Sequence, residues 1–433
     1  MQFKSVFIAV VISTALIVGA FLLNSKRPKS DLQQPSAQAV RATGKCAQCH
    51  RRETPAVVHQ YEKSKHAVSK VSCLDCHRVV KGQKSQAHRG FTITTKVTPK
   101  NCSQCHKTEH DQFMRSRHAA AAWAAVAGRK AFTKEQIAFA EKYHKGAIDR
   151  PANKLAQLEG PGAITKGCQG CHDIGKPNKD GSIGTCTHCH GRHAASVKLA
   201  RTPATCGQCH MGPDHSQLEI YRESKHGALF TAQKSSMNLR VSPKKLTTKH
   251  MSVPTCATCH MSGLNGMKVT HDVTDRLSWY LFSPVSKKRP GFLRGRNEMK
   301  DVCKNCHTSK TVNRFYKDAD VVVASTNAKV IEERKIMAGL RKDGLLTPKP
   351  FDEPIEFLHF DFWHYYGRTA KHAAFMGGAD FVQWHGNYEL LHLFVKIKKM
   401  AKQIRAAAAA KKAKGTDTAK NKAPAPRSRR KRR

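Results

Sequence analysis

All sixteen cysteines of this 433-residue chain belong to eight copies of one pattern, Cys-x-x-Cys followed at once by His. Because only 25 of the 433 residues are histidine, finding one after every pair has a chance of about 10⁻¹⁰. In chain order, the motif residues are Cys46, Cys49 and His50; Cys73, Cys76 and His77; Cys102, Cys105 and His106; Cys168, Cys171 and His172; Cys186, Cys189 and His190; Cys206, Cys209 and His210; Cys256, Cys259 and His260; and Cys303, Cys306 and His307.

This spacing is the one that covalent attachment of haem c requires. The two thiols form thioethers with the haem vinyl groups, and the adjacent histidine reaches the iron. A zinc ribbon would not need a histidine after every pair, and eight two-residue disulfide loops would be strained. The pattern therefore predicts eight covalently bound haem c groups, with the motif histidines as proximal iron ligands. The motifs span residues 46–307, so the haems must pack closely enough to pass electrons between them.

The charge of the chain is strongly positive. Lys and Arg number 76 against 31 Asp and Glu, which gives a formal net charge of +45. Each ferric haem with two ionised propionates adds roughly one negative charge, so a basic surface remains after eight haems are bound. Such a surface favours anionic substrates and acidic electron-transfer partners. Nucleic acid is not expected as a partner, because haem c is attached outside the cytoplasmic membrane.

Composition changes along the chain predict five segments. Residues 1–29 form a signal or membrane anchor, in which the uncharged, mostly apolar stretch 6–23 is just long enough to span a bilayer. We expect a periplasmic protein held at the inner membrane by this helix, with cleavage of the segment and secretion as the alternative. The remaining segments are a polar linker over 30–42, an octahaem domain over 43–310, a helical region over 311–405 and a basic tail over 406–433.

Two long helices are predicted after the last motif, over 328–342 and 389–410, from apolar residues at a spacing near 3.6. Residues 411–433 hold eleven Lys or Arg and one Asp, and we expect them to be disordered. This run either keeps the protein soluble or contacts anionic lipid head groups or an acidic redox partner.

Histidines outside the motifs can supply second axial ligands. A haem that only transfers electrons usually has such a ligand, whereas a catalytic haem keeps the position open. Seven candidates would complete seven haems and leave one open: His66, His118 and His226, in the phrases SKHA, SRHA and SKHG that each end a predicted helix; His88, His193 and His271, shortly after motifs; and His372, in the C-terminal helices. Eight others could substitute for them: His59, His110, His144, His250, His359, His364, His385 and His392.

The segment 211–226 follows the sixth motif and combines an acid with two histidines. Asp214 comes directly after Pro213 and is placed to cap a helix. His215 and His226 are eleven residues apart and would share one face of that helix. An Asp–His pair beside an open iron could relay protons. The alternative is a helix cap next to a buried polar histidine.

Residues 167–227 resemble the core of octahaem hydroxylamine oxidoreductases. The number and spacing of the motifs agree with that family, as do VPTCATCHM at 253–261, THD at 270–272 and HAAFMGGADFVQWHG at 372–386. The resemblance covers about residues 43–395. It implies a mainly α-helical fold with little β structure, closely packed haems and a homotrimer. It also implies that the fourth haem, carried by Cys168, Cys171 and His172, is the five-coordinate catalytic one, with Asp214 and His215 as its acid–base pair.

Members of this family interconvert small nitrogen compounds. Oxidative members convert hydroxylamine or hydrazine and cross-link the catalytic haem to a tyrosine of a neighbouring subunit. Tyr365, Tyr366 and Tyr388 are the C-terminal tyrosines here, and the phrase QWHGNYE is more similar to members without the link. We therefore favour reduction of nitrite or hydroxylamine toward ammonia, with electrons from a cytochrome or a membrane quinol dehydrogenase.

Three other functions follow from different features of the sequence. One is oxidative hydroxylamine or hydrazine dehydrogenation, if a tyrosine cross-link is present. Another is pure electron transfer by eight six-coordinate haems, for which the spare histidines suffice. A third class, octahaem reductases of sulfur oxyanions, usually has lysine as the catalytic proximal ligand. All eight motifs here end in histidine, which disfavours that class.

Overall fold

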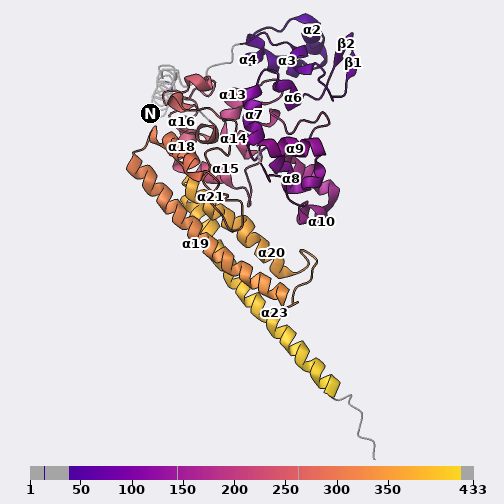
Figure 1. The fold of residues 1–433 in the computed structure, drawn as a ribbon. Helices are drawn as coiled ribbons and strands as arrows, with labels where there is room; N and C mark the ends of the chain where they lie inside the picture. Colours follow the sequence, from indigo (N-terminus) through magenta and orange to yellow (C-terminus); the bar gives the residue numbers. More distant parts are fainter. Residues whose placement is uncertain (1–13, 15–38, 144, 262, 421–433) are drawn as a thin grey trace, which may run out of the picture.

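The computed structural model describes residue 14 and residues 39–143, 145–261 and 263–420, and it is mainly helical (Figure 1). Its strands form a single antiparallel hairpin in the described part of the chain, between β1 (Gln86–His88) and β2 (Phe91–Ile93), with His88 opposite Phe91. The prediction of a mainly α-helical fold with little β structure is confirmed.

The motif-bearing part is built from short helices. Some are short segments that begin after a capping Ser or Thr: Ser72 forms a capping box with Asp75 at the start of Cys73–His77, and Thr98 caps Pro99–Cys102. The helices are α2 (Gly44–Glu53), α3 (Pro55–Glu62), α4 (Lys65–Val68), α5 (Cys73–His77), α6 (Pro99–Cys102), α7 (Lys107–Arg115), α8 (Ala120–Ala127), α9 (Lys134–Tyr143), α10 (Lys154–Ala163), α11 (Gln169–His172), α12 (Thr187–His190), α13 (Val197–Arg201), α14 (Pro203–Gly207), α15 (Gln217–Glu223), α16 (Lys225–Gln233), α17 (Cys256–His260) and α18 (Phe292–Lys304).

The C-terminal part has two long helices, which pack along each other together with shorter ones (Figure 1). Its elements are α19 (Ser309–Lys342), α20 (Pro354–Asp361), α21 (Arg368–Met376), α22 (Ala379–Val382) and α23 (Glu389–Lys420), with the π-helical turns η6 (Phe362–Gly367) and η7 (Gln383–Tyr388). Fully buried side chains such as Val330, Ile355, Phe362 and Leu390 form the core of this bundle. Both predicted helices are present, and both are longer than predicted.

The helix α23 extends to Lys420 and so includes residues 411–420 of the predicted tail, whose disorder stays a prediction. The remainder of the predicted tail, 421–433, lies outside the described residues. The last motif ends just before α19 begins at Ser309, close to the predicted boundary at residue 310. The domain limits themselves stay predictions.

From the sequence, we expected each Ser-Lys/Arg-His phrase to end a helix. In the structure, each phrase begins a new turn instead. α3 ends at Glu62 and α15 at Glu223, and the following Ser64 and Ser224 cap α4 and α16. In the SRHA phrase, the Ser116 hydroxyl accepts from the backbone N–H of His118. All three serines are buried, and each histidine follows two residues later. The capping hydroxyl fixes the backbone that points the histidine inward.

No helix within the described ranges is both long enough and apolar enough to cross a bilayer. This finding corrects the expectation of an N-terminal membrane anchor. The stretch 6–23 on which that expectation rested lies, apart from Thr14, outside the described residues.

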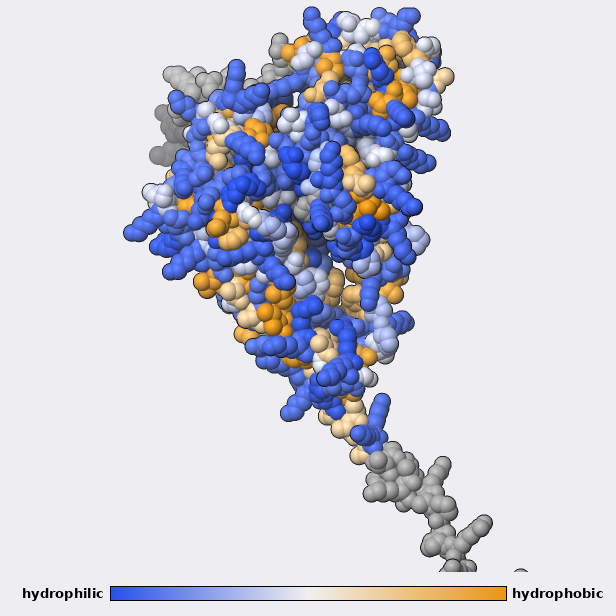
Figure 2. All heavy atoms as spheres, viewed as in Figure 1, coloured by the Kyte–Doolittle hydropathy of each residue, from blue (hydrophilic) through white to orange (hydrophobic). Residues whose placement is uncertain are grey.

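One face of the molecule is mainly hydrophilic. Figure 2 shows it covered by hydrophilic residues, with hydrophobic residues gathered in smaller patches.

Candidate functional site

One cavity of about 2940 Å³ runs through the motif-bearing part of the molecule. All eight motif histidines line it, together with fourteen of the sixteen cysteines; the other two, Cys105 and Cys306, are exposed. No disulfide joins the cysteines of any motif. A continuous cavity bordered by thiol pairs, each with its own imidazole, is what a chain of covalently attached haems needs, so the residues fit the predicted cofactor.

Six of the seven predicted second ligands lie opposite a motif histidine. The ring centroids are separated as follows: His50–His88 6.0 Å, His66–His106 6.1 Å, His77–His193 6.4 Å, His118–His210 5.8 Å, His190–His271 6.2 Å and His226–His307 6.0 Å. An imidazole–metal bond is about 2 Å long, so two rings on opposite sides of one metal have centroids roughly 6 Å apart. The pairs have the separation that two-histidine coordination requires.

Burial keeps His118 and His190 in the neutral form that can bind a metal. It lowers the pKa of His118 to about 3, with a smaller effect from the nearby charge of His210. It lowers the pKa of His190 to about 4, again helped by its partner, His271. Protonated imidazole cannot act as a ligand, so both effects favour coordination.

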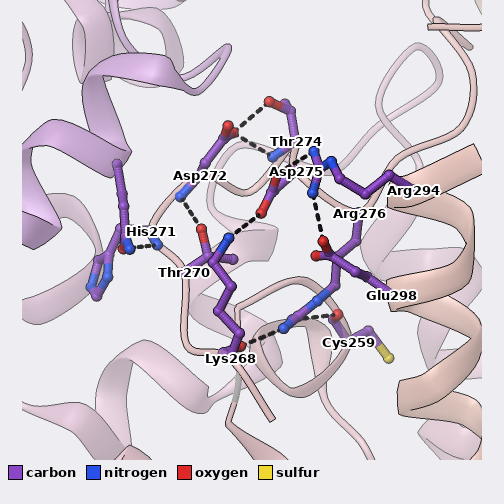
Figure 3. A network of polar contacts seen from close by, with 11 residues as sticks. Cys259, Lys268, Thr270, His271, Asp272, Thr274, Asp275, Arg276, Arg294 and Glu298 are labelled. Carbon is purple, nitrogen blue, oxygen red and sulfur yellow. Dashed lines mark hydrogen bonds and ion pairs between the residues drawn. The ribbon is translucent and has the colours of Figure 1, made fainter. Parts of the chain in front are cut away.

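The loop that carries His271 is held by a polar network (Figure 3). The backbone N–H of His271 donates to Gln112 Oε1 at 2.8 Å, and Asp272 Oδ1 accepts from the N–H of Thr274 at 3.0 Å. The buried Arg276 donates from Nη1 to the Cys259 carbonyl at 3.2 Å and from Nη2 to the Lys268 carbonyl. The network therefore ties the THD phrase to the seventh motif while His271 faces His190.

The fourth motif has different surroundings. His172 donates from Nδ1 to the Ala122 carbonyl at 2.7 Å, which leaves Nε2 available to a metal. The His215 ring lies 6.5 Å from the His172 ring and is perpendicular to it, at 87°. His215 is also 6.3 Å from His210, which already faces His118. It thus borders two motif histidines.

Asp214 and His215 form the predicted acid–base pair, with Asp214 Oδ2 2.6 Å from His215 Nδ1. Burial alone would raise the pKa of Asp214, but the hydrogen bond from His215 and nearby positive groups outweigh it and lower that pKa. The carboxylate therefore stays ionised and fixes a proton on Nδ1 of His215.

Two details predicted for this segment are wrong. Asp214 does not cap a helix: α15 begins at Gln217, its N-cap is Ser216, and the carboxylate binds His215 instead. His215 and His226 do not share one helical face, because His215 precedes α15 and the break at Ser224 separates α15 from α16.

Two further residues lie beside this pair: Arg368, which was not expected from the sequence, and His364, which was expected only as an alternative iron ligand. Arg368 Nη1 donates to His364 Nε2 at 2.8 Å and lies 3.9 Å from Asp214 Oδ2. Its Nε donates to the Phe282 carbonyl at 3.0 Å. No motif or spacing marks either residue. The only signal in the sequence is that Arg368 lies one helical turn before His372.

The seventh predicted second ligand, His372, has no such partner. Its ring packs on Phe282 at 4.5 Å, and its Nδ1 donates to the Arg368 carbonyl at 2.8 Å. Within the described part of the chain, no ring contact joins it to His260 or to another motif histidine, and its role as a ligand stays a prediction.

The alternative ligands are not brought to the motifs either. His144 lies outside the described residues, and across the rest of the described chain none of the others makes a ring contact with a motif histidine: His59, His110, His250, His359, His364, His385 and His392. His359, for example, pairs with the buried Glu333 at 2.7 Å inside the C-terminal bundle.

Of the three C-terminal tyrosines, Tyr365 is the one whose pKa is raised by the charge of Asp214. Burial raises its pKa, and the charges of Asp361 and Asp214 raise it further. Tyr388 is half exposed and packs on Trp384 at 5.3 Å.

The thiol pairs, the shared cavity and the facing imidazoles together define a multihaem c-type cytochrome. Residues 69–354 match the family model described as "Seven times multi-haem cytochrome CxxCH", and the chain belongs to this family. The matched range contains the second to the eighth motif, and the first, at Cys46–His50, precedes it.

Individual relatives agree with this assignment. A probable nitrite reductase–hydroxylamine oxidoreductase fusion protein of Kuenenia stuttgartiensis is 23% identical over 348 residues, which cover 71% of this chain and 39% of that protein. The chain thus spans about two-fifths of the length of this relative.

Two solved structures share the fold. A hypothetical multiheme protein has a TM-score of 0.72 at 22% identity, covering 88% of this chain and 99% of that one. A reducing hydroxylamine oxidoreductase-like protein complex of Kuenenia stuttgartiensis has a TM-score of 0.65 at 20% identity, covering 85% and 86%. The resemblance drawn from the sequence is confirmed for family and fold.

Proposed function

We propose that this protein is an oxidoreductase of small nitrogen compounds that carries eight haem c groups. Seven haems transfer electrons, and the fourth, on Cys168, Cys171 and His172, keeps an open position for substrate. The direction that we favour is reduction of nitrite or hydroxylamine toward ammonia. The observation that carries the proposal is the Asp214–His215 pair, which shares a proton at 2.6 Å and lies beside His172.

Cys168, Cys171 and His172 would hold the haem at the fourth motif, and this haem would supply electrons for reduction of the substrate nitrogen. Reduction of nitrite consumes protons as well as electrons, and we assign the delivery of these protons to Asp214 and His215. The ionised carboxylate holds Nδ1–H of His215, so Nε2 is the nitrogen that can hold or release a proton in the cavity. This division of roles is that of a carboxylate which orients a general acid–base histidine.

The comparisons support the class of substrate. The Kuenenia stuttgartiensis relative is named as a probable nitrite reductase–hydroxylamine oxidoreductase fusion, and a protein of the same fold is called a reducing one. We extend the nitrogen chemistry of those names to this chain, together with a cytochrome or quinol dehydrogenase as electron donor.

A homotrimer is part of the proposal, and the C-terminal helices offer a surface for it. Trp384, Tyr388, Leu391 and Val395 are 58%, 51%, 54% and 60% exposed. They follow one another at intervals of four, three and four residues along η7 and α23, which places them on one face. An apolar stripe with this spacing is suited to pack against another helix.

One set of measurements tests this function. Pyridine haemochrome and mass determination should find eight haems, and paramagnetic resonance should find one high-spin ferric iron that binds cyanide or nitric oxide. Assays with nitrite and with hydroxylamine in both directions then give the favoured reaction. The proposal of an open fourth haem would be overturned if all eight irons were low-spin and none bound cyanide or nitric oxide.

A second candidate function is electron transfer without catalysis. The observation in its favour is that the His172–His215 separation of 6.5 Å is close to those of the six histidine pairs. A carboxylate on Nδ1, as Asp214 provides, is also common for metal-binding histidines. If His215 is an iron ligand, His215→Ala creates a new high-spin iron. If it is an acid–base group, the spin state stays that of the wild type.

A further inference from the structure

The guanidinium of Arg368 is a buried cation beside the acid–base pair. Its side chain is 12% exposed and lines the same cavity as His172, His215 and Asp214. It stacks over Phe282 and Trp363, with its central carbon 5.3 and 5.0 Å from the ring centroids. The position is therefore that of a group fixed at the candidate substrate site, and not that of a surface charge.

Protein atoms use only part of the hydrogen-bonding capacity of Arg368. Nε donates to the Phe282 carbonyl and Nη1 to His364 Nε2. Because a guanidinium can only donate, His364 must accept with Nε2 and is held neutral. Burial and the positive charge of Arg368 favour the same state and lower the pKa of His364 to about 3. Among the described residues, no atom accepts from Nη2, whose two N–H groups remain for a ligand in the cavity.

Two guanidinium groups lie near the pair. The charges of Arg150 and Asp214 act on both His172 and Arg368. Asp214 is hydrogen-bonded to His215, and Glu159 acts on the Cys168 thiol and on Tyr365. Arg150 and Arg368 both line the cavity that His172 borders, and each of these cations favours a small anion beside it.

We propose that Arg368 selects the substrate by binding an oxyanion of nitrogen through Nη2, with His364 as the residue that positions it. This inference rests on the proposed function of the fourth haem site. A planar guanidinium matches two oxygens of one oxyanion and gives charge-assisted hydrogen bonds. Neutral hydroxylamine gains less from the same group, and ammonium is repelled by it.

The arrangement favours reduction over oxidation. In the reductive direction, Arg368 attracts the anionic substrate nitrite and repels the cationic product ammonium. In the oxidative direction, it would retain nitrite as product. A group can bias binding only through its different affinity for the two species, and a fixed cation has that difference.

The test compares nitrite with a neutral ligand on the complete haem-loaded protein. Nitrite and nitric oxide are titrated separately, by optical difference spectra, at one pH and one ionic strength. In Arg368→Met, nitrite binding should weaken roughly tenfold to hundredfold, the range expected for losing a charge-assisted hydrogen bond. Nitric oxide affinity should stay within about twofold, because a neutral ligand gains little from the cation.

The matched control is Arg296→Met, which removes a buried arginine that pairs with Asp320 and does not line the cavity. Nitrite affinity should not change in this variant. If Arg368→Met fails to retain its haems, the two titrations are made with Arg368→Lys instead. This variant keeps the positive charge and loses the planar guanidinium group. It should weaken nitrite binding about threefold to tenfold and spare nitric oxide.

The failures of the two proposals are distinguishable. If the wild type binds neither ligand, the open fourth haem is refuted, and the role of Arg368 falls with it. Suppose instead that the wild type binds both ligands. If Arg368→Met then binds nitrite as tightly as the wild type, only the role of Arg368 is refuted. The same holds for Arg368→Lys where it replaces Arg368→Met. An equal loss of nitrite and nitric oxide affinity refutes it as well, because a general disturbance of the site then explains the result.

Discussion

Replacing Asp214 by Asn should separate substrate binding from turnover. The exchange keeps the size of the side chain but removes the charge that holds His215 Nδ1 at 2.6 Å. Charge-assisted hydrogen bonds are roughly twice as strong as neutral ones, so the imidazole loses part of its orientation. A positioned acid–base group contributes about 10²–10⁴-fold to a rate, which equals roughly 3–5 kcal/mol. We expect turnover with nitrite to fall within that range.

Binding of nitrite should change in the opposite direction. Asp214 Oδ2 lies 3.9 Å from Arg368 Nη1, and two unit charges at that distance interact by about 4 kcal/mol at an effective dielectric constant of 20. Removing the carboxylate leaves the cation with less internal compensation. Nitrite should therefore bind Asp214→Asn as tightly as the wild type or more tightly.

The assay combines dye-driven nitrite reduction with an optical nitrite titration of the ferric protein. Asp318→Asn, an exposed position on α19, serves as the control. The haem spectrum should be the same in all three proteins, because Asp214 is not a proposed iron ligand. Turnover of Asp214→Asn within about threefold of the wild type would refute the acid–base role. So would a loss explained entirely by weaker nitrite binding.

Two further predictions concern stability and assembly. Asp180 is buried; burial raises its pKa, but hydrogen bonds from Ser182, Thr98 and Gln83 outweigh that effect and lower it. It should therefore contribute stability above its unfolded pKa of about 3.9, and this contribution is lost as pH falls through the folded value. Asp180→Asn should cost roughly 2–3 kcal/mol at pH 7 and flatten the acid limb in denaturant titrations, whereas an unchanged acid limb would exclude Asp180 as its source. Leu391→Asp, in the exposed stripe, should turn a trimer into monomers in light scattering with the haem spectrum unchanged, and a mutant that stays trimeric would place the interface elsewhere.

The motifs made the haem sites predictable, because each combines all its attachment groups within five residues. The second ligands were partly predictable for a similar reason. His66 and His226 each follow a helix-capping serine by two residues, and His118 follows Ser116, which accepts from its backbone N–H, at the same interval. This local pattern recurs in the sequence. Which histidine faces which motif was not predictable, since His118 meets His210 across 92 positions of the chain.

The residues around the acid–base pair could not be predicted from the sequence either, because they come from distant parts of the chain. Arg368 and His364 reach Asp214 across about 150 residues, through the packing of η6 and α21 against the motif-bearing part. Such contacts leave no periodic trace in the sequence. The capping role predicted for Asp214 failed because a hydrogen bond to His215 competes with the backbone for its carboxylate, which local patterns cannot reveal.

Removal of the haems should abolish the fold of the motif-bearing part. The cavity that the motif residues line has a volume of about 2940 Å³. An empty cavity costs about 24 cal/mol per Å³, so leaving it vacant would cost ~70 kcal/mol, and water entering it reduces this figure. Even a fifth of that cost equals the whole stability of an ordinary domain, which is about 5–15 kcal/mol.

The chain produced without haem attachment should therefore show no cooperative unfolding transition for this part. The helices α19 and α23 have a core of their own that includes Leu340 and Ile397, so some helical signal should persist. Far-UV circular dichroism and limited proteolysis of the haem-free and haem-loaded chains provide the comparison. A haem-free chain that unfolds cooperatively, within a few degrees of the loaded one, would mean that side chains can close the cavity. The motif-bearing part would then fold without its haems, and the haems would not form part of its core.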